Sequence, residues 1–304
     1  MNMCKHSCLI NIIFSCLLIL SLVFSTVNTA NKKIVKAAET EDYIEISNVS
    51  ELYAIRNNLE GKYILTKDID LSEATAPGGE LDVGNGWVPI DGFRGTLDGN
   101  GHYIKGLTMY GEVNQDYVGL FGNAYSPSSN FTVCNLGLVD VNINITMPKE
   151  KTYQSSDWYV GGIVGNGKGA KISSCFVTGN ITIQSESSDG CVGGLAGTEV
   201  YLKECYNAAN VNVYKEDGKT YRDLYVGGLC GISIYGSDTM LYNCGTINGG
   251  SGGAIAGGNG TGGHDDSGNN FYLQGTGMGQ SATPHTETQM KNKNYFSLLS
   301  PNNA

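Results

Sequence analysis

The sequence predicts an all-β fold, a three-sheet parallel β-helix in which short coils stack on one another. A glycine-rich motif recurs along the chain, and the last glycines of successive copies are 43, 32, 34 and 26 residues apart. Self-similarity at this period is typical of solenoids, propellers and arrays. The copies occupy residues 118–122, 160–165, 192–197, 226–231 and, more weakly, 252–257.

Each repeat contains three short segments rich in Val, Ile, Leu and Tyr, separated by Gly, Asn and Ser. This pattern indicates three strands with turns and no helix. A propeller blade needs four antiparallel strands, and a fourth segment is missing. Because one such unit cannot bury its inner face alone, neighbouring units must stack, which gives a parallel β-helix with three sheets.

A second mark follows the first four glycine motifs: an apolar residue, two variable residues and a cysteine. The four pairs are Phe131/Cys134, Ile172/Cys175, Leu202/Cys205 and Leu241/Cys244. Stacked strands lie about 4.8 Å apart, whereas disulfides need Cβ atoms about 3.8 Å apart that turn toward each other. We therefore expect a buried ladder of free thiols, although an even number of cysteines in an exported chain also suggests disulfides.

The segment Val192-Gly-Gly-Leu-Ala-Gly197, followed by Cys205-Tyr-Asn207, resembles the GLUG-motif repeats of bacterial secreted and cell-surface proteins. The resemblance extends from about Tyr117 to Tyr272, and residues 87–107 resemble the segment that precedes such repeats. It implies a right-handed parallel β-helix. Some members of the family carry an immunoglobulin A metallopeptidase domain, but this sequence has no His-Glu-x-x-His motif, so the resemblance does not carry that activity over.

Residues 1–37 are expected to be a signal peptide. Lys5 lies in a short basic region, residues 9–27 are almost continuously apolar, and Val35-Lys-Ala37 places small residues at a cleavage site. Cleavage after Ala30 or Ala38 and retention as a membrane anchor remain alternatives. The predicted organisation continues with an N-terminal cap and first coils at 38–116, the repeats at 117–279, and a C-terminal cap or tail at 280–304.

Local patterns predict the elements outside the repeats. Asn48 has the position of a helix cap, with Glu51 at the capping-box spacing. Leu52, Ile55 and Leu59 form the apolar face of this helix, and Gly61 ends it. The other expected elements are strands at 43–47, 63–71 and 271–273, a loop at 74–86, a turn at 98–101, and a small C-terminal helix at 286–299.

Charge and composition narrow the choice of partner. Removal of residues 1–37 leaves 15 basic and 29 acidic residues, a formal charge of −14. A chain this acidic repels nucleic acid, because phosphate binding needs clusters of Lys and Arg. We expect a glycan or a host or matrix protein as the partner, and contact with a membrane only through the leader if it is not cleaved.

The sequence offers no catalytic constellation, metal site or cofactor motif. The expected mature chain has three histidines, His102, His264 and His285. We interpret Asp98, Asn100 and His102 as part of a turn rather than as a cation or sugar site. His264-Asp265-Asp266 lacks further ligands for a metal.

Three insertions fall at one place in the repeat, at residues 146–158, 184–190 and 214–224. Stacking would align them along one edge, and loops on a rigid scaffold are where binding residues usually lie. Tyr153, Trp158, Tyr214 and Tyr221 are the candidate binding residues, because aromatic rings offer flat contact surfaces. The sequence thus favours an exported, non-catalytic, adhesin-like repeat protein at the cell surface or in the matrix. The alternatives are a β-helix carbohydrate-active enzyme and a structural spacer of a larger surface assembly.

Overall fold

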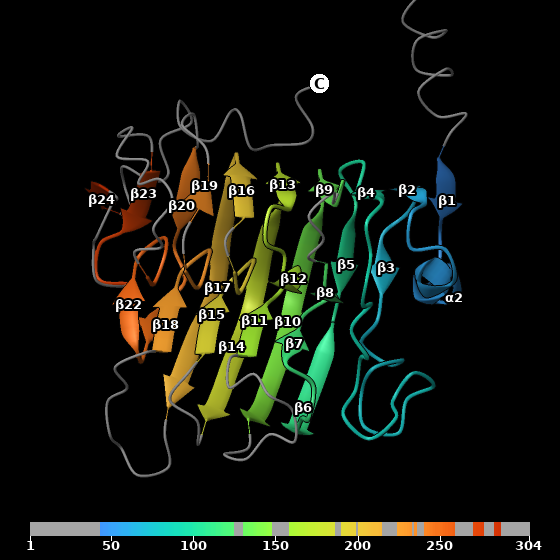
Figure 1. Cartoon of the computed structure of the whole chain (residues 1–304), viewed down its shortest axis with the longest axis horizontal. Coiled ribbons are helices and arrows are strands. Elements are labelled where there is room, and N and C mark those ends of the chain that lie inside the picture. Colours follow the sequence, from blue (N-terminus) through green and yellow to red (C-terminus); the bar gives the residue numbers. More distant parts are fainter. Residues whose placement is uncertain are drawn as a thin grey trace, which may run out of the picture. The chain divides into compact units, whose positions relative to one another are not determined.

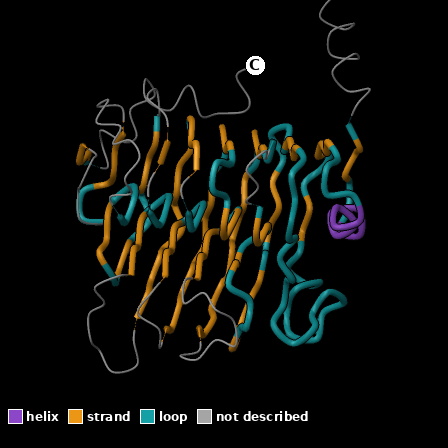
Figure 2. The backbone as a smooth tube through the Cα atoms, viewed as in Figure 1, coloured by secondary structure: helices purple, strands orange, loops and turns teal. Residues whose placement is uncertain are grey.

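Parallel strands wind through successive coils in the computed structural model, which confirms the predicted fold class (Figure 1). The structure describes residues 43–124, 130–147, 158–185, 190–198, 200–214, 224–232, 234–235, 240–258, 270–276 and 283–286. The chain divides into two units, Met1–Tyr43 and Ile44–Ala304, and the second contains the solenoid. Strands make up much of the central coils, whereas the first coils contain long loops (Figure 2), and all pairings between the described strands are parallel.

Within the described residues the first face of the solenoid is a seven-stranded sheet. Its strands, in spatial order, are β1 (Ile44–Ile46), β2 (Lys62–Leu65), β4 (Thr96–Asp98), β9 (Thr132–Cys134), β13 (Lys171–Ser173), β16 (Val200–Lys203) and β19 (Ile234–Tyr235). Neighbours in this order come from successive coils, which is the arrangement that stacking of the repeats requires.

The second face is a ten-stranded sheet of described strands, and it contains the longest ones. In spatial order these are β24 (Thr283–His285), β23 (Asn270–Leu273), β20 (Leu241–Asn243), β17 (Cys205–Tyr214), β14 (Phe176–Ser185), β10 (Gly137–Met147), β5 (Tyr103–Lys105) and β3 (Ile69–Asp70), with β21 (Ile247–Asn248) beside β17 and β6 (Thr108–Glu112) beside β10. The single strand expected at 63–71 is therefore two strands, because the chain turns a corner from the first sheet to the second.

The third face holds the glycine motifs. It comprises a five-stranded sheet of β22 (Ser251–Gly253), β18 (Leu224–Gly227), β15 (Gly190–Gly193), β11 (Trp158–Gly161) and β7 (Tyr117–Val118), and a pair of β12 (Val164–Asn166) and β8 (Phe121–Asn123). Val118, Val160, Val192 and Val226 are partners in consecutive strands, and Gly252 continues this register. The five motif copies are thus structurally equivalent, as their spacing predicts.

A short helix covers the first coil. Asn48 caps α2 (Val49–Tyr53), and its Oδ1 accepts a 2.9 Å hydrogen bond from the backbone N–H of Glu51. The Glu51 carboxylate in turn accepts bonds from the backbone N–H and hydroxyl of Ser47, at 2.7 and 2.9 Å. The helix continues as one 3₁₀ turn, η1 (Ala54–Asn57), so it ends before the predicted Gly61. Leu52 and Ile55 are fully buried, which confirms these two members of the predicted apolar face, whereas Leu59 lies beyond the end of the helix.

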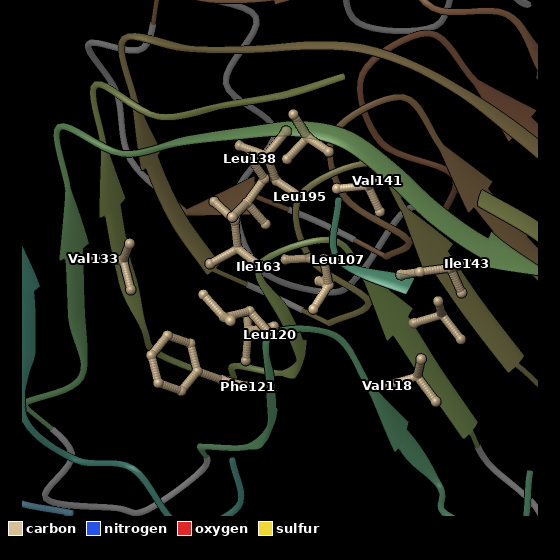
Figure 3. Close-up of a cluster of buried hydrophobic side chains, with 14 of the residues drawn as sticks. Leu107, Val118, Leu120, Phe121, Val133, Leu138, Val141, Ile143, Ile163 and Leu195 are labelled. Carbon is tan, nitrogen blue, oxygen red and sulfur yellow. The ribbon is translucent and has the colours of Figure 1, made fainter. Parts of the chain in front are cut away.

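The core lies between the faces and is built from columns of equivalent residues. Leu120, Ile163 and Leu195 occupy successive coils, as the bonds from the Leu120 N–H to the Gly162 carbonyl and from the Ile163 N–H to the Leu195 carbonyl show. Figure 3 shows these three side chains in line, with Ile143 from the ten-stranded sheet and Val133 from the seven-stranded sheet around them. Each coil thereby buries its apolar side chains against the next.

The predicted ladder of four cysteines is wrong in two of its members. Cys175 and Cys205 are buried and stack directly, but Leu136 and Leu241 occupy the equivalent positions in the flanking coils. Cys134 instead pairs with Ser173, and Cys244 is exposed. The six described cysteines are all free thiols. The column Leu136–Cys175–Cys205–Leu241 supports the expectation that the buried thiols pack as small hydrophobes.

The predicted C-terminal helix, the signal peptide and the motif at 264–266 lie outside the described residues. In the described part of the chain, no helix has the length and apolar character needed to cross a membrane.

Candidate binding face

The four aromatic residues expected to form a binding ridge do not share one position in the structure. Tyr153 and Tyr221 lie outside the described residues. Trp158 is the first residue of β11 and is fully buried, so the prediction that it offers an exposed ring is wrong. Its ring packs on Gly190, its partner in β15, where a β-carbon would collide with the indole. The insertion therefore ends before Trp158, whose ring fills the start of the next coil.

Tyr214 is the member of this set that lies at the surface in the described structure. It is the last residue of β17, and 48% of its surface is exposed. Its partner in β14 is Gln184, and the partner of Gln184 in β10 is Thr146. Tyr214 thus stands at one margin of the outer surface of the ten-stranded sheet, where the long strands β10, β14 and β17 lie side by side (Figure 1).

This outer surface carries a regular array of uncharged polar side chains. Strict alternation buries Ile143, Ile145, Ile181, Ile183, Val211 and Val213 on the inner side of the three strands. The residues between them face outward. We call these outward residues, with their neighbours near β21, the amide–hydroxyl face: Asn142, Asn144, Thr146, Asn180, Thr182, Gln184, Asn210, Asn212, Tyr214, Thr246 and Asn248.

Equivalent residues of successive coils form columns on this face. One column contains Asn142, Asn180 and Asn210, and the next contains Asn144, Thr182, Asn212 and Asn248. Three further residues begin or end these columns. They are Thr108 and Tyr110 on the β10 side and Thr246 on the β17 side. The same chemical groups thus repeat at the strand spacing of about 4.8 Å.

Part of the array is bonded internally and part is not. The Thr246 hydroxyl donates to Oδ1 of Asn210 at 2.7 Å, and Nδ2 of Asn210 donates to Oδ1 of Asn180 at 3.1 Å. Nδ2 of Asn248 donates to Oδ1 of Asn212 at 2.7 Å. Among the described residues, the side chains of Asn142, Asn144 and Gln184 make no hydrogen bond. Their donors and acceptors are therefore available to a ligand.

The charged residues near the face lie at its margins. Asp140 occupies a bulge in β10, has a backbone φ of 54°, and lies 4.0 Å from Nζ of Lys105. Glu112 pairs with Thr146 at the opposite end of the strands. The two acids are separated by about six residues along neighbouring strands, or roughly 20 Å. The face between them carries no formal charge.

The turn around Asp98 is a hydrogen-bonded corner, as expected. Oδ1 of Asp98 accepts bonds from the Asn100 N–H at 2.7 Å and from Nδ2 of Asn135 at 3.0 Å. Nδ1 of His102 lies 3.0 Å from Oδ1 of Asp68. The three residues thus bond to the surrounding corners rather than converging on one point. Within the described ranges, no group of three or more His, Cys, Asp or Glu side chains could hold a metal ion.

Asp82 has a strongly perturbed carboxyl group, but its surroundings identify it as the anchor of a loop. Its oxygens accept bonds from the backbone N–H groups of Gly78, Gly84 and Gly86 and from the Tyr110 hydroxyl, at 2.6–2.8 Å. These donors, led by the Tyr110 hydroxyl, hold the pKa of Asp82 far below its usual range. Both oxygens are engaged by donors, which leaves a cation no room to coordinate.

A column of aromatic rings runs along another part of the ten-stranded sheet. Phe176, Tyr206, Tyr242 and Phe271 are consecutive partners. The first two rings stack with centroids 4.9 Å apart and planes 3° apart, and the Phe176 ring also packs over Gly137. Burial, and then the nearby Cys244, raise the pKa of Tyr206 to about 12. The ring faces are used within the stack, so this column is structural.

Comparison with known proteins gives limited similarity. No protein-family model matches the chain. The chain is 32% identical over 168 residues to halomucin from Haloquadratum walsbyi, a match that covers 52% of this chain and 2% of halomucin. The crystal structure of a Bacteroides ovatus protein, provisionally named an immunoglobulin A1 protease, matches with 18% identity and a TM-score of 0.43. That match covers 75% of this chain and 63% of the solved one, so the chain spans less than two thirds of either protein.

Proposed function

We propose that this chain is an exported, non-catalytic repeat protein that binds a partner at the cell surface or in the extracellular matrix, as an adhesin does. The amide–hydroxyl face carries the proposal. Its side chains are fixed in register by parallel strands, and the amides of Asn142, Asn144 and Gln184 are exposed or half-buried without a bond inside the described structure. The leader-like residues 1–37 support export.

The main rival is a carbohydrate-active enzyme, because β-helices often host such activities. Glycoside hydrolysis uses two carboxyl groups about 5–10 Å apart. Glu112 and Asp140, which flank the face, are separated by roughly twice that distance. The carboxylates of Asp68, Asp82 and Asp98 serve as hydrogen-bond acceptors within loops and corners. This distribution of acids favours binding over catalysis.

A second alternative is a spacer that has no ligand of its own. The outer surface of a spacer has to be soluble, and proteins usually achieve this with interspersed charged residues. The eleven residues of the amide–hydroxyl face include no charged residue, although acidic residues are frequent elsewhere in the chain. The replacement of charge by amides and hydroxyls over three long strands favours recognition of a ligand.

Two tyrosines provide a matched test. Tyr214 lies on the amide–hydroxyl face and is 48% exposed, whereas Tyr201 lies on β16 of the seven-stranded sheet and is 46% exposed. We expect Tyr214→Ser to reduce retention of labelled protein on producing cells or host matrix about fivefold or more, because truncating an interface anchor often costs above 1 kcal/mol. Tyr201→Ser should leave retention unchanged.

The melting temperatures of both variants should be close to that of the wild type, since about half of each tyrosine is exposed to solvent. If wild-type protein is not retained on either material, the binding function is wrong. If both substitutions reduce retention equally, the amide–hydroxyl face is not the site.

A further inference from the structure

We infer, on the basis of the proposed function, that the ligand of the amide–hydroxyl face is an uncharged polysaccharide. Its chain runs across β10, β14 and β17, in the direction in which the coils stack. It contacts the two columns that contain Asn142 and Asn144 and reaches the ring of Tyr214 at the margin. This assigns both a substrate class and an orientation to the face.

The chemistry of the face matches sugar hydroxyls. Each Asn or Gln amide offers two donors and one acceptor oxygen, and each Thr hydroxyl both donates and accepts. A sugar hydroxyl likewise donates and accepts, so one hydroxyl can bond to the amide N–H of one residue and the oxygen of the next. The eleven residues provide no cation to pair with a carboxylate or sulfate. The acidic chain as a whole opposes polyanions.

A protein ligand fits the face less well. The centres of protein–protein interfaces are enriched in aromatic residues, Met and Arg, which act as desolvated anchors. On the amide–hydroxyl face Tyr214 is the one large ring, and it stands at the margin. A broad array of exposed amides without an apolar centre is better suited to a partner that is itself covered with hydroxyl groups.

The repeat of the columns gives the orientation. Along the stacking direction, Asn142, Asn180 and Asn210 present the same amide in three successive coils. Along a single strand the outward residues change, as from Asn180 through Thr182 to Gln184. Three successive identical contacts to a polymer of identical sugar units are possible in the first direction, whereas along β10 or β17 the outward amide occurs only twice in succession. Repeated weak contacts on one chain then add up to useful avidity.

The unused hydrogen-bonding groups show where contact is strongest. On the β17 side, the Asn210 amide is engaged with Thr246 and Asn180, and the Asn212 oxygen with Asn248. On the β10 side, the Asn142 and Asn144 amides have no partner in the described part of the chain. A ligand gains bonds to Asn142 and Asn144 without breaking any that the protein makes itself. These two residues are therefore the predicted centre of recognition.

The test compares the wild type with the double variant Asn142→Asp/Asn144→Asp, which keeps the side-chain shape but removes both amide groups, with their four N–H donors, and adds two negative charges. Lys171→Glu, at an exposed position of β13 in the seven-stranded sheet, changes the net charge by the same amount and is the control. Retention is measured on the material that holds the wild type, untreated, after periodate oxidation of its sugars, and after protease digestion. Pull-down on amylose, β-glucan, galactomannan and chitin, with alginate and hyaluronan as polyanions, runs in parallel.

We expect periodate, but not protease, to abolish retention, and we expect binding to a neutral polysaccharide to persist at about 1 M salt, where exposed charges are screened within about 3 Å. The double variant should bind about tenfold more weakly, because the donors of both amide groups are lost, and Lys171→Glu should bind normally. Retention that protease removes and periodate spares would overturn the polysaccharide while leaving the binding function intact. Binding to the polyanions that salt abolishes would also overturn it. Absence of wild-type retention on every untreated material would instead refute the proposed function.

Discussion

Nδ2 of Asn207 donates a 2.9 Å hydrogen bond to Oδ1 of Asn243, and the two buried residues occupy equivalent positions in adjacent coils. Asn207 also bonds to the backbone N–H and carbonyl of Ala209, and Asn243 to the carbonyl of Gly245. In the two preceding coils the same column contains Leu138 and Val177. The core thus changes from an apolar column to a fully bonded amide pair.

Asn207→Val should lower the free energy of unfolding by about 2 kcal/mol, because it leaves polar groups of Ala209 and Asn243 buried in the core without a hydrogen-bond partner. Urea denaturation of the purified protein provides the measurement. The solvent-facing Asn144→Val is the control and should change stability by less than about 0.5 kcal/mol. Equal midpoints for wild type and Asn207→Val would show that the amide pair makes no net contribution.

Thiol chemistry should follow position in the coils. The order of alkylation by a maleimide in the native protein should be Cys244 first, then Cys134, with Cys175 and Cys205 reacting only on unfolding. The Cys244 residue is exposed, although partial cover of its sulfur raises its pKa. Burial, followed by Asp98, raises the pKa of Cys134 to about 12, and burial raises that of Cys175 well above its ordinary value. Mass spectrometry of a time course checks the order, and early labelling of Cys175 would contradict it.

The thiols with a raised pKa, Cys134, Cys175 and Cys244, set an alkaline limit on stability. Because the folded state holds these protons more tightly than the unfolded chain, whose thiols titrate near pH 8.5, their contribution is complete below that pH and declines as the pH rises above it. Cys175→Leu introduces the residue type that Leu136 and Leu241 already place in this column, and it should weaken the alkaline decline. An unchanged profile of stability against pH for this variant would contradict the contribution of Cys175 to the alkaline decline.

Asp82 should set part of the acid limit. Its depressed pKa means that the folded state favours the carboxylate, so its contribution is present above the unfolded value of about 3.9 and is lost as the pH falls below it. Asp82→Asn should make the protein less stable at neutral pH, since the loop donors at Gly78, Gly84 and Gly86 lose a charged acceptor. It should also flatten the loss of stability between pH 4 and 2. Melting curves recorded across pH measure both effects. Parallel profiles of stability against pH for the wild type and Asp82→Asn would show that Asp82 does not set part of the acid limit.

The sequence was sufficient for the fold because the glycine motifs recur at positions that are truly equivalent, as the partners Val160 and Val192 show. The cysteine register was not predictable by spacing. Val133, rather than Phe131, pairs with Ile172, and Leu136, rather than Cys134, lies opposite Cys175, so the sequence pattern is displaced by two residues from the structural register in this coil. The corner that follows β9 and β13 uses Asn135 and Ser174 at a φ of 52°, where no glycine marks the turn.

The site was harder to predict than the fold. Trp158 reads as part of an insertion, but its burial follows from a contact with Gly190 in the next coil, more than thirty residues away. An isolated Asn in a strand is an ordinary surface residue, so neither Asn142 nor Asn180 by itself indicates a binding site in the sequence. Their significance comes from the register of β10 and β14, which places them in one column. Thr146, Gln184 and Tyr214, the first residues of the three predicted insertions, are partners in adjacent strands and link the predicted loop edge to this face.

The second glycine of the three central motifs (Gly162, Gly194 and Gly228) should be intolerant of a side chain, and the intolerance should be graded. A β-carbon at Gly194 would meet the Asn207 amide and the Gly228 carbonyl, whereas at Gly162 it would lie 2.7 Å from the Gly194 carbonyl and 2.9 Å from Cγ1 of Val177. Overpacking a dense core commonly costs about 1–3 kcal/mol. Gly194→Ala should lie at the upper end of that range, because it collides with a bonded amide and with backbone.

Gly162→Ala should cost less, because its closest backbone contact, the Gly194 carbonyl oxygen at 2.7 Å, is farther away than the backbone contact of a β-carbon at Gly194, and its other close contact is to the Val177 side chain. Shortening Val177 removes that second contact. The double variant Gly162→Ala/Val177→Ala should therefore be more stable than the two separate losses predict, which a double-mutant cycle in urea measures directly. Removing the Asn207 side chain cannot rescue Gly194→Ala, since the Gly228 carbonyl stays in place. Two outcomes would show that close packing between coils does not require the repeated glycine. One is additive losses of stability at Gly162 and Val177, and the other is a free energy of unfolding of Gly194→Ala equal to that of the wild type.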